Sequence, residues 1–198
     1  MHKPSITAHT GALNTKPNTL DSVRAALSSG ADIFEVDVRF LPDGTPALGH
    51  NKVDAGSARL EEVFALMQGC TIQINLDMKE TSNIPRMAEL VARYGLQDRA
   101  FMTGLSKSAC AALRSCGLPY YLNGASPTAA LKLGALGVNI NFRQCTKRLV
   151  RDAHAQGLLV SAWTADSPRT MHKMLRRGAD NITTRHPDVL LEIIGHET

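Results

Sequence analysis

Short apolar runs alternate along this chain with segments in which apolar residues recur every three or four positions. A short apolar run or period-two alternation is typical of a β-strand, and the longer period is typical of an amphipathic helix. Eight strands are predicted in this way, over residues 5–8, 33–40, 71–79, 100–103, 120–122, 137–141, 158–164 and 181–184. Helical spacing follows each of them, over residues 20–29, 60–67, 84–94, 107–116, 127–133, 146–156, 168–177 and 187–194.

The repeated strand–helix order predicts a parallel sheet, and eight such units close into a (β/α)8 barrel, the TIM-barrel fold. The alternative is an open, doubly wound sheet. No phosphate-binding glycine fingerprint follows the first predicted strand, and the candidate polar residues fall at strand ends, so the barrel is favoured. The chain has 198 residues where the fold typically has about 250, so we expect one compact domain over residues 1–198 with tight connections.

The second predicted strand is extended by an extra arm. The turn Pro42-Asp43-Gly44 is typical of a tight reversal, so the chain is expected to return as a short strand that ends at His50. We therefore predict a short β-hairpin arm after the second strand of the barrel.

Composition and charge narrow the class of protein. The formal net charge is +4, but the 22 lysines and arginines are spread along the sequence and only 5% of residues are aromatic. A weak attraction for anionic small molecules fits this pattern, whereas a nucleic-acid partner does not. The cysteines show no metal-ligand spacing, and we find no apolar stretch suited to a signal peptide or a transmembrane segment. We therefore expect a cytoplasmic protein with reduced thiols.

Three acidic residues on predicted strands are candidate metal ligands. Glu35 and Asp37 face the same side of their strand, roughly 7 Å apart, and Asp77 comes near the end of the next one. An acidic residue on a strand more often lies on a solvated face. The strand around Glu35 is apolar on both sides, however, and buried carboxylates without a partner are costly. Oxygen donors alone suit a hard divalent cation, Mg²⁺ or Ca²⁺.

Two histidines, a lysine and a tryptophan are expected beside these acids, because the ends of all barrel strands meet at one mouth. His9 and His50 could exchange a proton across a phosphorus centre, one as base and one as acid. Lys79 could hold a phosphate oxygen, or simply form an ion pair with Asp77. Trp163 could belong to the barrel core, but its position at a strand end favours a substrate contact.

Over nearly its full length the chain resembles the glycerophosphodiester phosphodiesterase family. The resemblance is carried by His9-Thr10-Gly11, Asn18-Thr19-Leu20, Glu35-Val36-Asp37-Val38, Asp43-Gly44-Thr45-Pro46, His50-Asn51 and, later, by Asn75-Leu76-Asp77-Met78-Lys79, Ala162-Trp163-Thr164 and the segment 178–184 with Pro187-Asp188. It implies a barrel, one divalent metal and hydrolysis of a glycerol-linked phosphodiester to sn-glycerol 3-phosphate and an alcohol. It also implies attack by a neighbouring hydroxyl of the substrate, assisted by the residues that match His9 and His50.

Several departures from the family pattern leave the substrate open. Thr10, a candidate substrate-binding residue, stands where the family usually has an arginine that binds the phosphate. The stretch between His50 and Leu60 is much shorter than the family's insertion, which covers part of the mouth. Asp77 replaces a glutamate, and Asp77-Met78-Lys79 resembles the sphingomyelinase D-like phospholipases. Two alternatives therefore remain: a sphingomyelinase D-like or lysophospholipase D-like lyase, releasing a cyclic phosphate from a lipid, and a non-catalytic barrel that binds metal or phosphate.

Overall fold

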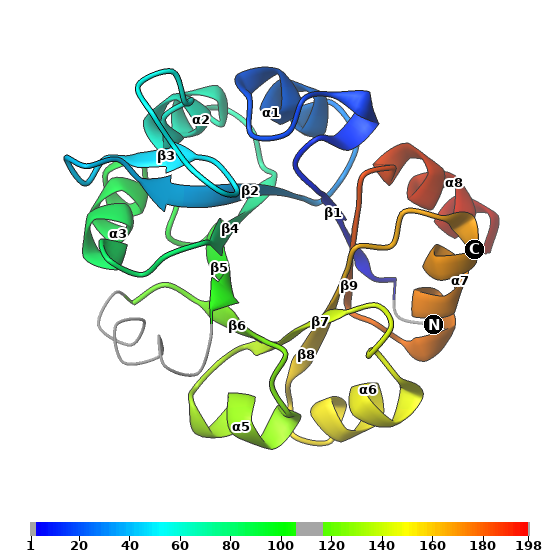
Figure 1. Cartoon of the computed structure of the whole chain (residues 1–198). Coiled ribbons are helices and arrows are strands. Elements are labelled where there is room, and N and C mark those ends of the chain that lie inside the picture. The colour runs from blue at the N-terminus through cyan, green and yellow to red at the C-terminus, as the bar shows by residue number, and fades with distance from the viewer. Residues whose placement is uncertain (1–2, 106–116, 198) are drawn as a thin grey trace.

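The computed structural model describes residues 3–105 and 117–197, and within them eight parallel strands form a ring with helices around its outside (Figure 1). The ring strands are β1 (Ser5–Ala8), β2 (Ile33–Phe40), β4 (Gln73–Met78), β5 (Ala100–Leu105), β6 (Tyr120–Asn123), β7 (Gly137–Asn141), β8 (Leu159–Trp163) and β9 (Asn181–Thr184). The helices are α1 (Leu20–Leu27), α2 (Leu60–Leu66), α3 (Ile84–Arg93), α5 (Pro127–Lys132), α6 (Lys147–His154), α7 (Pro168–Arg177) and α8 (Pro187–Glu197). The helix expected over residues 107–116 lies outside the described residues.

Hydrogen-bonded pairing closes the ring. The strands follow one another in the order β1-β9-β8-β7-β6-β5-β4-β2, and β2 pairs with β1 again, every pair being parallel. The short strand β3 (Pro46–Leu48) runs antiparallel to β2 and forms the arm that leads to His50. The predicted (β/α)8 barrel and its hairpin arm are therefore confirmed.

Local sequence signals set most element boundaries. Thr19 begins α1 because its hydroxyl oxygen accepts the backbone N–H of Ser22, and Thr146 and Ser167 begin α6 and α7 in the same way. The strand expected over residues 71–79 is shorter, and the one expected over 100–103 continues through Gly104 to Leu105. A short 3₁₀ helix, η1 (Ala12–Asn14), lies in the loop after β1. Among the described residues, no helix combines the length and apolarity that crossing a bilayer requires.

Two apolar regions lie on opposite sides of the strands. Phe34, Val36 and Val38 belong to the main core, which packs between the ring and the helices. The other face of β2 starts with Ile33, which joins a separate apolar cluster with Phe101. Because side chains alternate along a strand, Glu35 and Asp37 follow Ile33 on that inner face. The inner face of β2 thus changes from apolar at its amino end to acidic towards its carboxyl end.

Candidate active site

The carboxyl ends of the strands surround a cavity of about 440 Å³. Seven of the eight residues singled out from the sequence line it: His9, Glu35, Asp37, His50, Asp77, Lys79 and Trp163. They come from β1, β2, β4, β8 and the hairpin arm, so the closure of the ring brings together residues that are far apart in the sequence. We call this cavity the mouth.

The three carboxylates lie together in the mouth. Asp37 and Asp77 are register partners on β2 and β4, and one oxygen from each of these groups and from Glu35 lies within 4.8 Å of the others. Glu35 is 4% exposed, and its Oε2 accepts the backbone N–H of Thr10 at 2.9 Å. Its Oε1 is buried without a hydrogen-bond partner among the described residues. Burial and the charges of Asp77 and Asp37 raise the pKa of Glu35 well above its ordinary 4.5.

Lys79 partly neutralises this cluster. Its Nζ lies 2.8 Å from Oδ1 of Asp37 and 2.5 Å from Oδ2 of Asp77. Burial alone would lower the pKa of Lys79, but the two carboxylates outweigh it, so the pKa is raised and the amine stays protonated. Three carboxylates and one ammonium leave two negative charges when all are ionised. A divalent cation on the unpartnered oxygen of Glu35 would balance them, so these residues fit a hard metal ion.

Asn18 holds Asp37 in place. Its amide nitrogen donates to Oδ2 of Asp37 at 2.7 Å, and the backbone N–H of Asp37 donates to Oδ1 of Asn18 at 3.1 Å. The backbone of Asn18 has a φ of 58°, a left-handed conformation that asparagine tolerates better than most residues. The sequence motif contained Asn18, but its role as a positioning residue was not predicted.

Each of the two histidines has a hydrogen bond at its Nδ1, and the two rings differ in their surroundings. Nδ1 of His9 donates to the carbonyl of Thr10 at 2.8 Å, so Nε2 of the neutral ring carries the lone pair. Burial lowers the pKa of His9 below 6.5; the bond to Thr10 opposes this shift, and the charge of Arg185 adds to it. His50 is exposed on the hairpin arm, and its Nδ1 donates to Oδ1 of Asn51 at 2.9 Å.

Thr10 and Trp163 differ in how they meet the mouth. Thr10 is buried, and its hydroxyl oxygen accepts the backbone N–H of Asn18 at 2.7 Å. Its predicted contact with substrate stays a prediction. Trp163 lines the mouth, and its indole Nε1 is buried without a hydrogen-bond acceptor among the described residues. A buried indole N–H usually finds an acceptor, which is consistent with a substrate oxygen at this point.

Sequence reasoning overlooked Arg185, which also lines the mouth. This residue directly follows β9, and its Nη1 lies 2.5 Å from Oδ2 of Asp166. Its position immediately after a predicted strand was the signal that could have identified it, because every such position in a barrel faces the mouth region.

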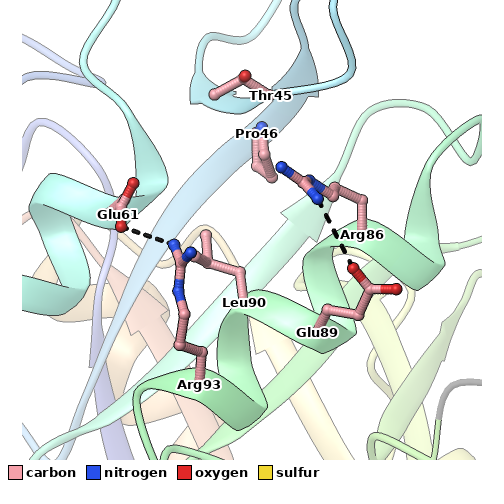
Figure 2. Close-up of a pocket in the computed structure, with 7 residues that line it drawn as sticks. All are labelled: Thr45, Pro46, Glu61, Arg86, Glu89, Leu90 and Arg93. Carbon is pink, nitrogen blue, oxygen red and sulfur yellow. Dashed lines mark hydrogen bonds and ion pairs between the residues drawn. The ribbon is translucent and has the colours of Figure 1, made fainter.

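A second, smaller cavity lies on the outer wall (Figure 2). It has a volume of about 250 Å³ and is lined by Thr45, Pro46, Glu61, Arg86, Glu89, Leu90 and Arg93. Arg93 pairs with Glu61 at 2.6 Å and Arg86 with Glu89 at 3.8 Å, as Figure 2 shows. Both charged pairs are exposed and mutually neutralised, so we assign no site to this cavity.

Carboxylates, histidines and a lysine at the carboxyl ends of the strands of a closed barrel form a site of the kind that TIM-barrel enzymes use for catalysis. The chain belongs to the glycerophosphoryl diester phosphodiesterase family, whose family model matches residues 9–106 and 112–189. The resemblance read from the sequence is thereby confirmed.

Relatives and solved structures agree with this membership. A glycerophosphodiester phosphodiesterase of Caldanaerobacter subterraneus is 21% identical over 97% of this chain and 98% of its own length. One from Bacillus altitudinis is 25% identical, covering 95% of this chain and 97% of its own. An Oleispira antarctica phosphodiesterase, solved with its product sn-glycerol-3-phosphate, superposes with a TM-score of 0.87 at 18% identity over 97% of both chains. The structure of a Parabacteroides distasonis glycerophosphodiester phosphodiesterase superposes with a TM-score of 0.85 at 21% identity over 98% of both chains.

Proposed function

We propose that this protein hydrolyses a glycerol-linked phosphodiester to sn-glycerol 3-phosphate and an alcohol, with the help of a divalent cation. One observation carries the proposal: three carboxylates, one with an unpartnered buried oxygen, lie in the same mouth as two histidines. The Oleispira antarctica structure, which holds sn-glycerol-3-phosphate, supports the choice of product.

Glu35, Asp37 and Asp77 would hold the cation, Mg²⁺ or Ca²⁺. When bound, such an ion polarises a non-bridging phosphate oxygen and offsets the charge that develops as the diester is attacked. Asn18 keeps Asp37 in position, and the backbone N–H of Thr10 does the same for Glu35. Lys79 keeps the cluster from being excessively negative and lies where it could also contact a phosphate oxygen.

We assign His9 as the base and His50 as the acid. Burial favours the neutral form of His9, and its bond to Thr10 leaves Nε2 to accept the proton of the attacking hydroxyl. The new phosphorus–oxygen bond forms as the bond to the leaving alcohol breaks, and His50 gives that alcohol oxygen a proton, which leaves a cyclic phosphate of glycerol. Water then attacks the phosphorus as the ring phosphorus–oxygen bond breaks. In this second step the exposed His50 accepts the proton of the water and His9 returns its proton to the ring oxygen, so that sn-glycerol 3-phosphate forms and both histidines regain their starting states.

Turnover assays test this proposal. Each of His9→Ala and His50→Ala should lower kcat by about a hundredfold or more, the usual contribution of a general acid or base, while circular dichroism shows the fold retained. His196→Ala is the matched control, because that ring is exposed on α8 and does not line the mouth. Ordinary turnover of a glycerophosphodiester panel by both mouth variants would rule out the two-histidine mechanism.

The identity of the product separates the alternatives. Phosphorus NMR of the reaction should show a phosphomonoester, whereas a sphingomyelinase D-like lyase would accumulate a cyclic phosphodiester. A chelator should abolish turnover and added Mg²⁺ or Ca²⁺ should restore it. A barrel that only binds metal or phosphate would turn over none of the panel in any of these conditions.

A further inference from the structure

We propose that Arg185 is a phosphate-binding residue. Its guanidinium supplies, from the end of β9, the positive charge that Thr10 does not supply from the end of β1. The inference rests on the proposed function, because it places the substrate's phosphate in the mouth. It assigns the phosphate clamp to a position that the sequence motifs did not indicate.

The pairing of β1 with β9 places Arg185 beside His9. Ala8 and Thr184 are register partners, so the next residue on each strand is His9 on one side and Arg185 on the other. The backbone N–H of His9 donates to the carbonyl of Thr184 at 2.8 Å, and that of Leu13 donates to the carbonyl of Arg185 at 3.0 Å. These bonds fix the backbone of Arg185 against the turn that contains Thr10.

The guanidinium is anchored and still has donors to offer. Nη1 of Arg185 donates to Oδ2 of Asp166 at 2.5 Å, and Oδ1 of Asp166 accepts the backbone N–H of Arg185 at 2.8 Å. A guanidinium has five N–H donors, so this ion pair orients the group and leaves most of the fork for a ligand. The side chain is 45% exposed and lines the mouth. A planar fork of this kind suits two oxygens of one phosphate.

The charges of the mouth are divided between two walls. Lys79 is bound between Asp37 and Asp77 on the side formed by β2 and β4, so its charge is largely taken up there. Arg185 and Trp163 lie on neighbouring strands, β9 and β8, and the indole N–H of Trp163 has no acceptor among the described residues. One wall therefore offers carboxylates to a cation, and the other offers the exposed guanidinium of Arg185 to phosphate oxygens.

Calorimetric binding of sn-glycerol 3-phosphate to the whole chain, with Mg²⁺ present, tests the inference without requiring turnover. Arg185→Met should weaken binding by about tenfold to a hundredfold, the usual effect of losing charge-assisted hydrogen bonds. The affinity of Arg185→Lys should lie between those of the unaltered chain and Arg185→Met, because lysine keeps the positive charge but lacks the planar set of N–H donors. Thr10→Arg, added to the Arg185→Met variant, should restore much of the affinity for sn-glycerol 3-phosphate, because it places a positively charged side chain at the end of β1.

Two controls distinguish a ligand from a structural ion pair. Asp166→Asn removes the ion pair but keeps the guanidinium and an oxygen for the backbone N–H, so affinity should be retained or increased. Arg143→Met removes an arginine that stacks on Phe142 just beyond β7, and it should leave affinity unchanged. Equal losses in Asp166→Asn and Arg185→Met, no loss in Arg185→Met, or no binding to the unaltered chain would each overturn the inference.

Kinetics then separate this inference from the proposed function. Turnover by the unaltered chain together with a raised KM in Arg185→Met supports both the proposed hydrolysis and the role of Arg185 in phosphate binding. Binding that depends on Arg185 in a chain that hydrolyses no glycerophosphodiester would leave Arg185 as a phosphate ligand and remove the proposed reaction. Hydrolysis with an unchanged KM in Arg185→Met would remove the inference alone.

Discussion

The environment of Glu35 gives the clearest indication that the site is functional. It is buried beside two other carboxylates, and one of its oxygens has no hydrogen-bond partner among the described residues. A group placed only for stability would be expected to have its hydrogen bonds satisfied. The raised pKa of Glu35 means that its ionised form destabilises the metal-free fold, so the residue has been retained for something other than stability.

Glu35→Gln should therefore stabilise the metal-free protein while removing activity. The pKa of Glu35 is higher in the folded protein than its ordinary 4.5 in the unfolded chain. The protonated side chain therefore favours folding below pH 4.5, and this contribution is lost as the pH rises through the folded-state pKa. At pH 7 we expect a gain of roughly 1–3 kcal/mol in the free energy of unfolding, measured by urea denaturation in EDTA. The gain should shrink towards pH 4. Glu89→Gln, an exposed change on α3, should give no gain; equal behaviour of the two variants would contradict this account of Glu35.

The pH dependence of the reaction should report His9. Its pKa lies below 6.5 chiefly because the ring is buried, so the neutral, proton-accepting form predominates at pH 7. We expect kcat/KM to fall on the acidic side with a midpoint below pH 6.5, where His9 takes up a proton. A steady-state pH profile checks this. An acidic limb centred above pH 6.5 would argue against His9 as the base.

At the scale of elements, the end of β5 shapes the metal site. Gly104 has a φ of +77°, and a Cβ there would lie 2.3 Å from Oδ1 of Asp77 and 2.4 Å from the carbonyl oxygen of Met78. The register between β5 and β6 shifts at the same point. A glycine is thus required both by the backbone conformation and by the close approach of a candidate ligand.

Gly104→Ala should disturb both stability and metal binding. Gly95→Ala is its matched control, because Gly95 also has a positive φ and a Cβ there would meet nothing within 4 Å. The control should lose about 1–2 kcal/mol for the left-handed conformation alone. Gly104→Ala should lose roughly 1–3 kcal/mol more through the steric conflict, and its affinity for divalent cations should fall. Thermal unfolding and cation titration measure the two effects; equal losses would contradict the steric argument.

The elements also show how far the sequence could be interpreted alone. Eight strands could be located because their apolar runs are bounded by polar loops and glycines, and the acidic and histidine positions followed from strand ends. The continuation of β5 through Gly104 could not be predicted, because a left-handed glycine usually marks the end of a strand. The roles of Asn18 and Arg185 depend on side chains that meet across β1, β2 and β9, and spacing along one chain does not specify such contacts.

At the scale of the whole molecule, the barrel interior below the mouth combines apolar and polar side chains. Ile33, Phe101 and Tyr121 form an apolar cluster near the amino ends of their strands. Polar side chains lie beside it, because Thr7 is the register partner of Ile33 and Asn75 is that of Phe101. These polar groups are hydrogen-bonded: Thr7 donates to Asn181 at 2.8 Å, Asn181 donates to Ser161 at 3.0 Å, and Thr103 donates to Asn75 at 2.8 Å. The side chains beneath the mouth are therefore fixed before any ligand arrives.

A divalent cation should stabilise this molecule measurably. Binding to the folded state alone adds about 2.7 kcal/mol at a hundred times the Kd, which for a chain of this size corresponds to roughly 5–11 °C in Tm. Scanning calorimetry with and without EDTA measures the shift. Asp77→Asn should reduce it strongly, and Asp54→Asn, a change in the loop after β3, should not. An unshifted Tm across millimolar Mg²⁺ and Ca²⁺ would speak against a resident metal.

The arm that carries His50 is joined to the ring through β3, which pairs with β2 as an antiparallel extension and is bonded on its other edge to Ala58 and Arg59. The eight-stranded ring does not need β3 in order to close. Half of the proposed proton-transfer pair therefore lies on an extension whose local opening would leave the ring closed. Mild denaturant should lower the activity before it unfolds the barrel, and amide exchange should be faster in β3 than in β2.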